Sequence, residues 1–303
     1  MINYQVQLQT DLSLQLQAEL SLETETAVRM ALEKWLSPVF TDKAKDVDLR
    51  FYSSETDDQK YAIHDIINDS RTSYTIQLPK QNYMHLGIAN MEGSNHLRHI
   101  GNDHSVTSTL RLNDASVYAP LNTGVFTARL PMDVNDTTQS FHVHLYMVNS
   151  AVAVVIDTTA CDSLISVSGT MLGSADEFAI RDSAFSFTKS PVFRMEQVPV
   201  TAASLMRPRA PRASLPNFFD CLGTVCLPTQ PEKPWTIQIV ATLKENRHTT
   251  TTLTIPDFLP AGTLRVLKLT MDAQGGIKTE DGSEIGASIE LDWKSGGEHT
   301  IDI

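Results

Sequence analysis

The chain has 303 residues, of which 41% are hydrophobic and 20% are charged, and its formal net charge is −12. This composition supports a full hydrophobic core and excludes an intrinsically disordered chain. The acidic balance excludes a nucleic-acid-binding protein, which needs a basic surface, and no run of 18 apolar residues is present that could span a membrane.

The amino-terminal segment alternates in polarity over an unusual length. Every even position from Ile2 to Leu22 is apolar, except for Thr10. At about 3.3 Å per residue, one strand of this length would span roughly 70 Å, which is far longer than an ordinary strand. We therefore predict a strand that begins at Ile2 and then bends or divides.

One helix is predicted at about residues 26–37. Thr26 is a residue type that caps helix N-termini, and Pro38 stops the helix. The apolar stripe between them has helical spacing and consists of Val28, Leu32, Trp35 and Leu36.

The remaining chain has the period-two pattern of half-buried antiparallel strands, in two series. The first series has its apolar positions at Val47/Leu49/Phe51, Tyr74/Ile76/Leu78, Met84/Leu86/Ile88 and Phe126/Ala128/Leu130. The second has them at Phe141/Val143/Leu145/Met147, Ala151 to Ile156, Leu164/Val167/Met171, Trp235/Ile237/Ile239, Leu253/Ile255 and Leu264 to Met271. The sequence therefore predicts an all-β fold with one short helix.

The length favours two domains of about 150 residues rather than one. The polar segment Pro131 to Gln139 separates the two strand series, so we predict one β-sandwich at residues 1–135 and another at 136–303. Between Met195 and Pro234 the periodicity disappears and prolines are frequent. This predicts an irregular insert at about 195–234.

The last twenty residues keep one apolar phase across a glycine pair. The phase consists of Ile285, Ala287, Ile289, Leu291 and Trp293 and resumes after Gly296-Gly297 at His299, Ile301 and Ile303. Chain ends usually fray unless they pair with a neighbour. The pattern therefore predicts a terminal strand that lies against an edge, in its own sheet or in that of another subunit.

No catalytic motif accompanies these strands. The loop that contains His96, His99 and His104 could in principle hold a divalent metal, but a polar surface loop is the commoner structure for such a sequence. No nucleophile elbow, zinc-protease motif, P-loop or dinucleotide fingerprint is present. We therefore predict a protein that is not an enzyme and has no cofactor.

Two cysteines lie close together in the segment FFDCLGTVCLP. Cys221 and Cys226 could form a small disulfide ring or remain two free thiols, and the sequence leaves both alternatives open.

Several segments together resemble the FimB/Mfa2 family, the anchor subunits of the type V fimbriae of Bacteroides-like bacteria. The resemblance spans essentially the whole chain and is carried by the order of ALEKWLSPVFTDKAKDVDLRFY, SYTIQLPKQNYMHLGIAN, TGVFTARLPM, QSFHVHLYMVNSAVAVVI and EIGASIELDWKSGGEHTIDI. It implies two tandem transthyretin-like antiparallel β-sandwich domains. It also implies export and display on the outer membrane through an N-terminal lipid, although the lipidated cysteine of that family is absent from this sequence.

The resemblance also implies fimbrial stalk (pilin) subunits as partners, joined by strand addition. An anchor of this kind keeps its own N-terminal strand, here Tyr4, Val6 and Leu8. It could donate its C-terminal strand, whose apolar positions are Leu291, Trp293, His299, Ile301 and Ile303. The alternative is that this strand stays within its own second domain.

A second hypothesis from a different class is a surface glycan-binding β-sandwich lipoprotein. Such a protein needs exposed aromatic platforms. The chain has only three tryptophans, and the patterns around Trp35, Trp235 and Trp293 all predict inward-facing side chains.

Overall fold

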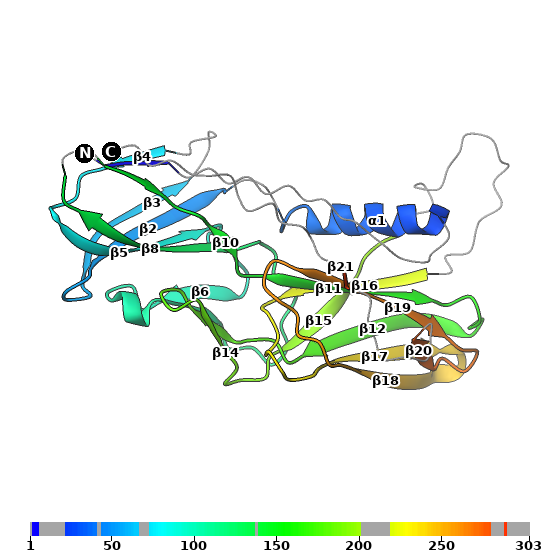
Figure 1. Cartoon of the computed structure of the whole chain (residues 1–303). Coiled ribbons are helices and arrows are strands. Elements are labelled where there is room, and N and C mark those ends of the chain that lie inside the picture. The colour runs from blue at the N-terminus through cyan, green and yellow to red at the C-terminus, as the bar shows by residue number, and fades with distance from the viewer. Residues whose placement is uncertain are drawn as a thin grey trace.

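A computed structural model describes residues 2–5, 22–40, 44–66, 73–136, 139–200, 219–279 and 288–289. Over these residues the chain forms four sheets with mostly antiparallel pairing and a single α-helix, which confirms the predicted fold class. The molecule is elongated, with the first strands at one end and the last strands at the other (Figure 1). Among the described residues, no helix is both long enough and apolar enough to cross a membrane.

The first half is built around a five-stranded sheet. In spatial order its strands are β10 (Tyr146–Met147), β8 (Phe126–Val134), β5 (Gln81–Ala89), β2 (Asp46–Ser53) and β3 (Gln59–Ile66). Next to it lies a three-stranded sheet of β4 (Ser73–Ile76), β1 (Ile2–Gln5) and β9 (Ser140–His142). The Tyr74 hydroxyl of β4 donates a hydrogen bond of 2.9 Å to Asp65 of β3, which ties these two sheets together.

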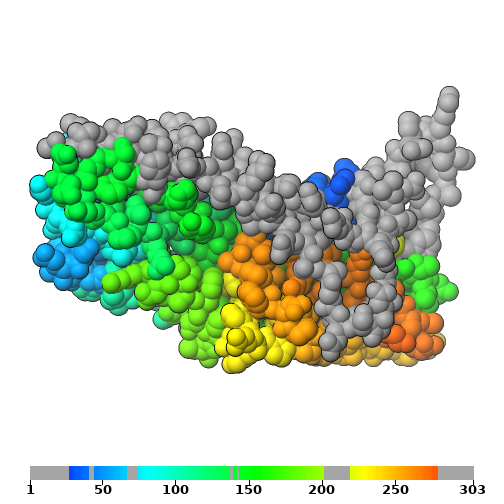
Figure 2. Space-filling model, in the orientation of Figure 1, coloured from blue at the N-terminus to red at the C-terminus, as the bar shows by residue number. Residues whose placement is uncertain are grey.

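A four-stranded sheet is shared by both halves of the chain. Its order is β14 (Ala184–Ser186), β13 (Glu177–Ala179), β7 (Thr109–Leu112) and β6 (Leu97–Ile100). The Tyr52 hydroxyl of β2 donates to the carbonyl oxygen of Asn102 at 3.0 Å and joins this sheet to the five-stranded one. Figure 2 accordingly shows yellow-green surface from the region of β13 and β14 next to the blue and cyan N-terminal elements.

The second half folds as two facing layers joined through one strand. The nine strands follow the order β18 (Arg247–Ile255), β17 (Trp235–Leu243), β12 (Leu164–Leu172), β15 (Val192–Gln197), β16 (Phe219–Cys226), β11 (Ser150–Asp157), β19 (Leu264–Met271) and β20 (Ile277–Thr279), with β21 (Ser288–Ile289) also on β19. β15 pairs with β12 near its start and with β16 at its end. The layers meet where the Cys226 sulfur lies 3.6 Å from the Met171 sulfur.

The helix α1 (Leu22–Leu36) begins four residues before the predicted start and ends one residue before the predicted end. Its stripe packs as predicted, because Val28, Leu32 and Leu36 are at most 1% exposed. However, the helix lies on the second half of the chain rather than in the first (Figure 1). A Cβ atom placed on Gly223 of β16 would be only 2.4 Å from the Trp35 ring.

The helix explains the continuous apolar run at residues 151–156. β11 is buried on both faces, because one face contacts the opposite layer and the other lies under α1. A strand covered on both sides has no polar phase, and β11 also pairs in parallel with β19, as such buried strands often do.

The predicted insert at 195–234 is only partly correct. β15 runs to Gln197, and β16 crosses the segment as a strand with pairs on both sides, to β15 and to β11. Residues 201–218 lie outside the described part of the chain. β16 has no alternating pattern because it is buried on both faces, with glycine, threonine and cysteine among its residues.

The domain boundary between residues 135 and 136 stays a prediction. β8 continues through Pro131 to Val134 on the five-stranded sheet, and β10 pairs with β8 at Phe126 and Thr127. Past Thr127, β8 has β5 on one side and no described strand on the other, and a strand with one open side is where a proline such as Pro131 is tolerated.

Two short 3₁₀ turns complete the described structure, at η1 (Ser105–Thr107) and η3 (Lys244–Asn246).

Candidate functional site

The first strand of the chain lies in the middle of its sheet. β1 pairs antiparallel with β4, Tyr4 opposite Tyr74, and parallel with β9, Gln5 opposite His142. Backbone hydrogen bonds can therefore be satisfied on both sides of β1. Of the predicted N-terminal strand positions, Tyr4 belongs to β1, while Val6 and Leu8 lie outside the described residues.

The last described strand, β21, lies at an edge of the nine-stranded sheet. β21 pairs antiparallel with the start of β19, so that Ile289 is opposite Leu264 and Ser288 is opposite Arg265. β20 pairs with the other end of β19. The predicted donor positions Leu291, Trp293, His299, Ile301 and Ile303 lie outside the described residues. Their pairing stays a prediction.

The three histidines of the loop contact separate partners. The ring of His96 packs edge-on against Tyr118, with ring centroids 5.4 Å apart. Nε2 of His99 lies 2.8 Å from the Ser108 hydroxyl, and Nδ1 of His104 lies 3.1 Å from the carbonyl oxygen of Asp57. In the described part of the chain, no group of three His, Cys, Asp or Glu side chains is placed to hold a metal ion. The fold therefore does not bring these residues together as a metal centre.

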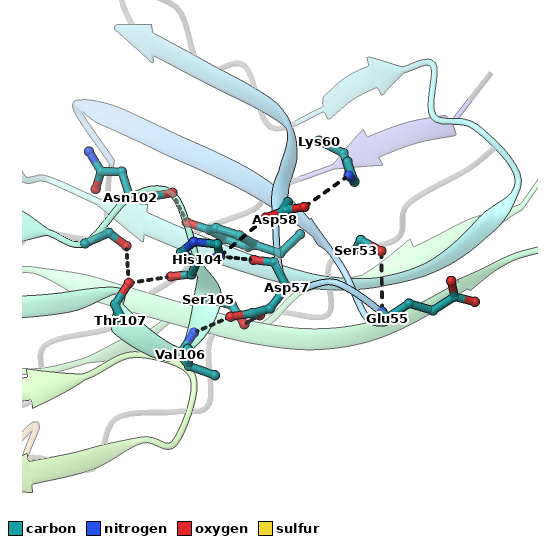
Figure 3. A network of polar contacts seen from close by, with 12 residues as sticks. Ser53, Glu55, Asp57, Asp58, Lys60, Asn102, His104, Ser105, Val106 and Thr107 are labelled. Atoms are coloured by element: carbon teal, nitrogen blue, oxygen red, sulfur yellow. Dashed lines mark hydrogen bonds and ion pairs between the residues drawn. The ribbon is translucent and has the colours of Figure 1, made fainter.

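Instead, the loop belongs to a polar cluster around the turn between β2 and β3 (Figure 3). The Asp57 carboxylate accepts a short hydrogen bond from the Ser105 hydroxyl and one of 3.1 Å from the Val106 amide. The Arg181 guanidinium, from the turn between β13 and β14, lies 3.3 Å from Asp57 and 3.1 Å from the Ser105 hydroxyl. One carboxylate thus connects three loops that are far apart in sequence.

The electrostatics of this cluster favour the charged carboxylate. Partial burial acts to raise the pKa of Asp57, but the hydrogen bonds from Ser105 and Val106 and the charge of Arg181 outweigh it and lower the pKa below its ordinary value. Asp57 also has a positive φ of 58°, which aspartate tolerates better than most residues. These contacts of Asp57 with Ser105, Val106 and Arg181, hereafter the Asp57 clasp, have a structural role, because the two charged groups already have partners within the chain.

Replacing Asp57 by alanine should lower the free energy of unfolding by about 1–2 kcal/mol, because it leaves the Ser105 hydroxyl and the Arg181 guanidinium without their acceptor. Asp58→Ala is the matched control in the same turn, since the Asp58 side chain is 52% exposed and its ion pairs to Lys60 and His104 are 3.6 Å or longer. This control should cost less than about 0.5 kcal/mol. Urea denaturation measures both, and equal losses would contradict the clasp.

The two neighbouring cysteines are free thiols, so the disulfide alternative is wrong. Both lie on β16, five residues apart on one continuous strand, which keeps their sulfur atoms far from disulfide distance. Burial raises the pKa of Cys221 to about 12 and also raises the pKa of Cys226. Both sulfurs are therefore protonated and unreactive at neutral pH.

The comparisons with known proteins rest on structure alone, since no family model and no curated protein matches the sequence. A candidate adhesin from Bacteroides thetaiotaomicron aligns with a TM-score of 0.56 at 10% identity, covering 82% of this chain and 91% of the other. A candidate polysaccharide-binding protein from the same organism has a TM-score of 0.52 at 10% identity, covering 81% and 90%. A candidate adhesin from Bacteroides ovatus has a TM-score of 0.51 at 10% identity, covering 82% and 90%.

The shared property is the fold. Each alignment includes at least four-fifths of this chain, so the likeness of fold extends over parts of both halves. At 10% identity, nothing about individual residues carries over.

Proposed function

We propose that this chain is a non-enzymatic cell-surface subunit of an adhesive fimbria, and more narrowly an anchor of the FimB/Mfa2 type. The observation that carries the proposal is the place of β1, which is the central strand of its sheet and belongs to the chain itself. A subunit with this strand in place has no vacant position there for the strand of a neighbour. It is suited to begin or end a polymer rather than to extend it in both directions.

Two further observations support the proposal. Two of the structural neighbours are candidate adhesins of Bacteroides species, and their fold includes most of this chain. The terminal segment alternates apolar residues such as Leu291 and Trp293 with acidic residues such as Glu290 and Asp292. Such a segment can add to a sheet edge by main-chain hydrogen bonds and place alternate side chains in pockets.

In this proposal, the segment from Leu291 to Ile303 joins the chain to a fimbrial stalk subunit, and an N-terminal lipid holds the mature protein on the outer membrane. The lipid can be tested on protein isolated from its native host. It should partition into the detergent phase, and its N-terminal peptide should have the mass of a diacylated cysteine. An unmodified N-terminus on the native surface protein would contradict lipid anchoring.

The strand contact is tested by deleting Ser295 to Ile303. We expect the truncated protein to keep its unfolding temperature and to lose binding to the purified stalk subunit, because the donated strand is gone. Two point variants test the same contact more specifically. Ile301→Asp changes a residue of the apolar phase, and Thr300→Asp changes a residue of the opposite phase. Only the first should weaken stalk binding. A truncated protein that folds normally and still binds the stalk would show that this strand is not the donor.

Glycan binding has less support. Of the three tryptophans, Trp235 is 1% exposed, and its indole N–H donates to the carbonyl oxygen of Asp257 at 2.7 Å. Trp35 of α1 is partly buried against Gly223 of β16. Trp293 lies outside the described residues. Neither described tryptophan forms the flat exposed platform on which a sugar ring stacks. Specific binding of the protein on a glycan array would support the glycan-binding hypothesis.

A further inference from the structure

Among the described strands, β18 has the longest open edge. Its nine residues pair with β17 from Arg247, opposite Leu243, to Ile255, opposite Trp235, with no shift of register. No described strand lies on its other side, and β18 forms the lower border of the second half in Figure 1. Every second residue of such a strand directs its N–H and C=O groups outward, where they can pair with another strand.

The other long edges have features that hinder strand addition. On β3, the Asp65 carboxylate already accepts a hydrogen bond from the Tyr74 hydroxyl. The part of β8 that has only one partner strand contains Arg129 and Pro131. Charged residues and proline on an edge are common protection against pairing with another chain. β18 has no proline, and its one Lys, Arg, Asp or Glu residue is Arg247 at its first position.

The contacts that β18 makes within the chain do not occupy its outer edge. The Thr249 hydroxyl donates to the carbonyl oxygen of Gly275 at 2.7 Å, and the Thr251 hydroxyl accepts from the Ile277 amide at 3.4 Å. Nδ1 of His248 lies 3.2 Å from a threonine hydroxyl on β17. All three contacts use side chains of β18, so they do not engage its outward main-chain groups.

The sequence of β18 is compatible with itself in one antiparallel register. A two-fold axis through Thr251 overlaps all nine residues with those of a second copy, and facing side chains then lie on the same side of the sheet. The centre consists of threonine pairs, which can stabilise a sheet, and no charged residue faces a like charge. The facing pairs are Thr251–Thr251, Thr250–Thr252, Thr249–Leu253, His248–Thr254 and Arg247–Ile255.

We propose that β18 pairs antiparallel with β18 of a second copy of this chain, with the two-fold axis at Thr251. The sheet then continues from one copy into the other over about 30 Å of paired strand. Because both copies use the same edge, the assembly closes at two subunits. A single pair of edges buries less surface than a standard interface, so the dimer is weak. The contact uses neither the first nor the last strand of the chain, so it does not depend on the proposed fimbrial function.

Sedimentation velocity of the full-length protein tests the dimer between about 5 and 500 µM, a range suited to a weak interface. We expect wild type to convert from monomer to dimer in this range. Thr250→Lys/Thr252→Lys should weaken the dimer at least tenfold, because like charges then face each other twice. Thr250→Lys/Thr252→Glu should dimerise at least as tightly as wild type, because this register brings the new lysine of each copy opposite the new glutamate of the other.

The matched control is Ser166→Lys/Ser168→Lys on β12. These two exposed residues lie two strands from the edge in the same sheet, so dimerisation should stay within about twofold of wild type. Hydrogen exchange locates the contact, because the outward amides of β18 should exchange more slowly as the protein concentration rises, while β3 should not change. A wild-type protein that stays monomeric at 500 µM would overturn the proposal. Equal weakening by the Lys/Lys and Lys/Glu variants, or a dimer that the Lys/Lys variant retains in full, would also overturn it.

Discussion

Replacing Gly223 by valine should lower the free energy of unfolding by about 2–3 kcal/mol. The first atom of any side chain at this position would lie 2.4–2.7 Å from three carbons of the Trp35 ring, so the helix must shift or the ring must leave its site. Overpacking of this kind typically costs 1–3 kcal/mol. Gly223 is absent from the residues with positive φ, so the cost comes from the lost space and not from a strained backbone.

A double-mutant cycle isolates the contact. Trp35→Ala by itself should cost about 2–3 kcal/mol, less than a fully buried tryptophan, because Trp35 is only partly buried. In the double variant, valine occupies part of the space left by the ring, so the combined loss should be smaller than the sum by at least about 1 kcal/mol. The matched control is Gly87→Ala, because a methyl group at this position makes only ordinary van der Waals contacts. Gly93→Ala would not serve as a control, because the positive φ of Gly93 adds backbone strain. Strict additivity at positions 35 and 223 would contradict the packing of the helix on β16.

Acidification from pH 6.5 to 4 should destabilise the protein through two buried histidines. Burial lowers the pKa of His85 from 6.5 to about 4, and burial followed by the nearby Arg50 charge lowers the pKa of His99 to about 4. The unfolded chain takes up protons near pH 6.5, while the folded chain keeps both rings neutral until about pH 4. Falling pH therefore favours unfolding throughout this window. Above pH 6.5 the histidine contribution is fully present.

The expected size is about 3 kcal/mol for His85 over the whole window, at 1.36 kcal/mol for each unit of pKa. The fully buried ring stacks on Phe51 at 4.5 Å and lies 2.9 Å from the carbonyl oxygen of Arg50, so it has little room to admit water when protonated. Urea denaturation at half-unit intervals of pH measures the slope. His85→Asn should make this slope shallower and leave the part that comes from His99, while His248→Asn, on the exposed part of β18, should leave the slope as in the wild type. The stabilisation from the Asp57 clasp is present above the ordinary carboxyl pKa of 3.8 and is lost only below it, so it does not change the slope between pH 6.5 and 4. A slope that His85→Asn does not change would contradict this assignment.

Elements with one covered face could be predicted directly from sequence. The stripe that includes Val28 and Leu32 located the helix, and the alternation at Val47, Leu49 and Phe51 located β2, because local periodicity records which side of an element is buried. β3 was not predicted, since its side chains are exposed on both faces and show no alternation. β16 was missed for the opposite reason, because it is buried on both faces without being rich in branched apolar residues.

The candidate site was less predictable than the fold. The spacing of His96, His99 and His104 was compatible with a shared ion, but strand pairing places their rings against Tyr118, Ser108 and the Asp57 turn. The clasp itself depends on Arg181, which is 124 residues away from Asp57 in the sequence. A contact between such distant loops leaves no local pattern from which it could be recognised.

The sequence by itself determined that this protein is a β-protein with one amphipathic helix, a chain-initial strand and an apolar run at residues 151–156 that forms a buried strand. The tertiary structure decided which surfaces meet. It placed α1 on β16 of the second half, joined β13 to β7 in one sheet, and left β18 as an open edge. The physical reason is that side-chain periodicity specifies that a face must be covered, whereas the partner that covers it is selected by shape and hydrogen bonding between segments far apart in the chain.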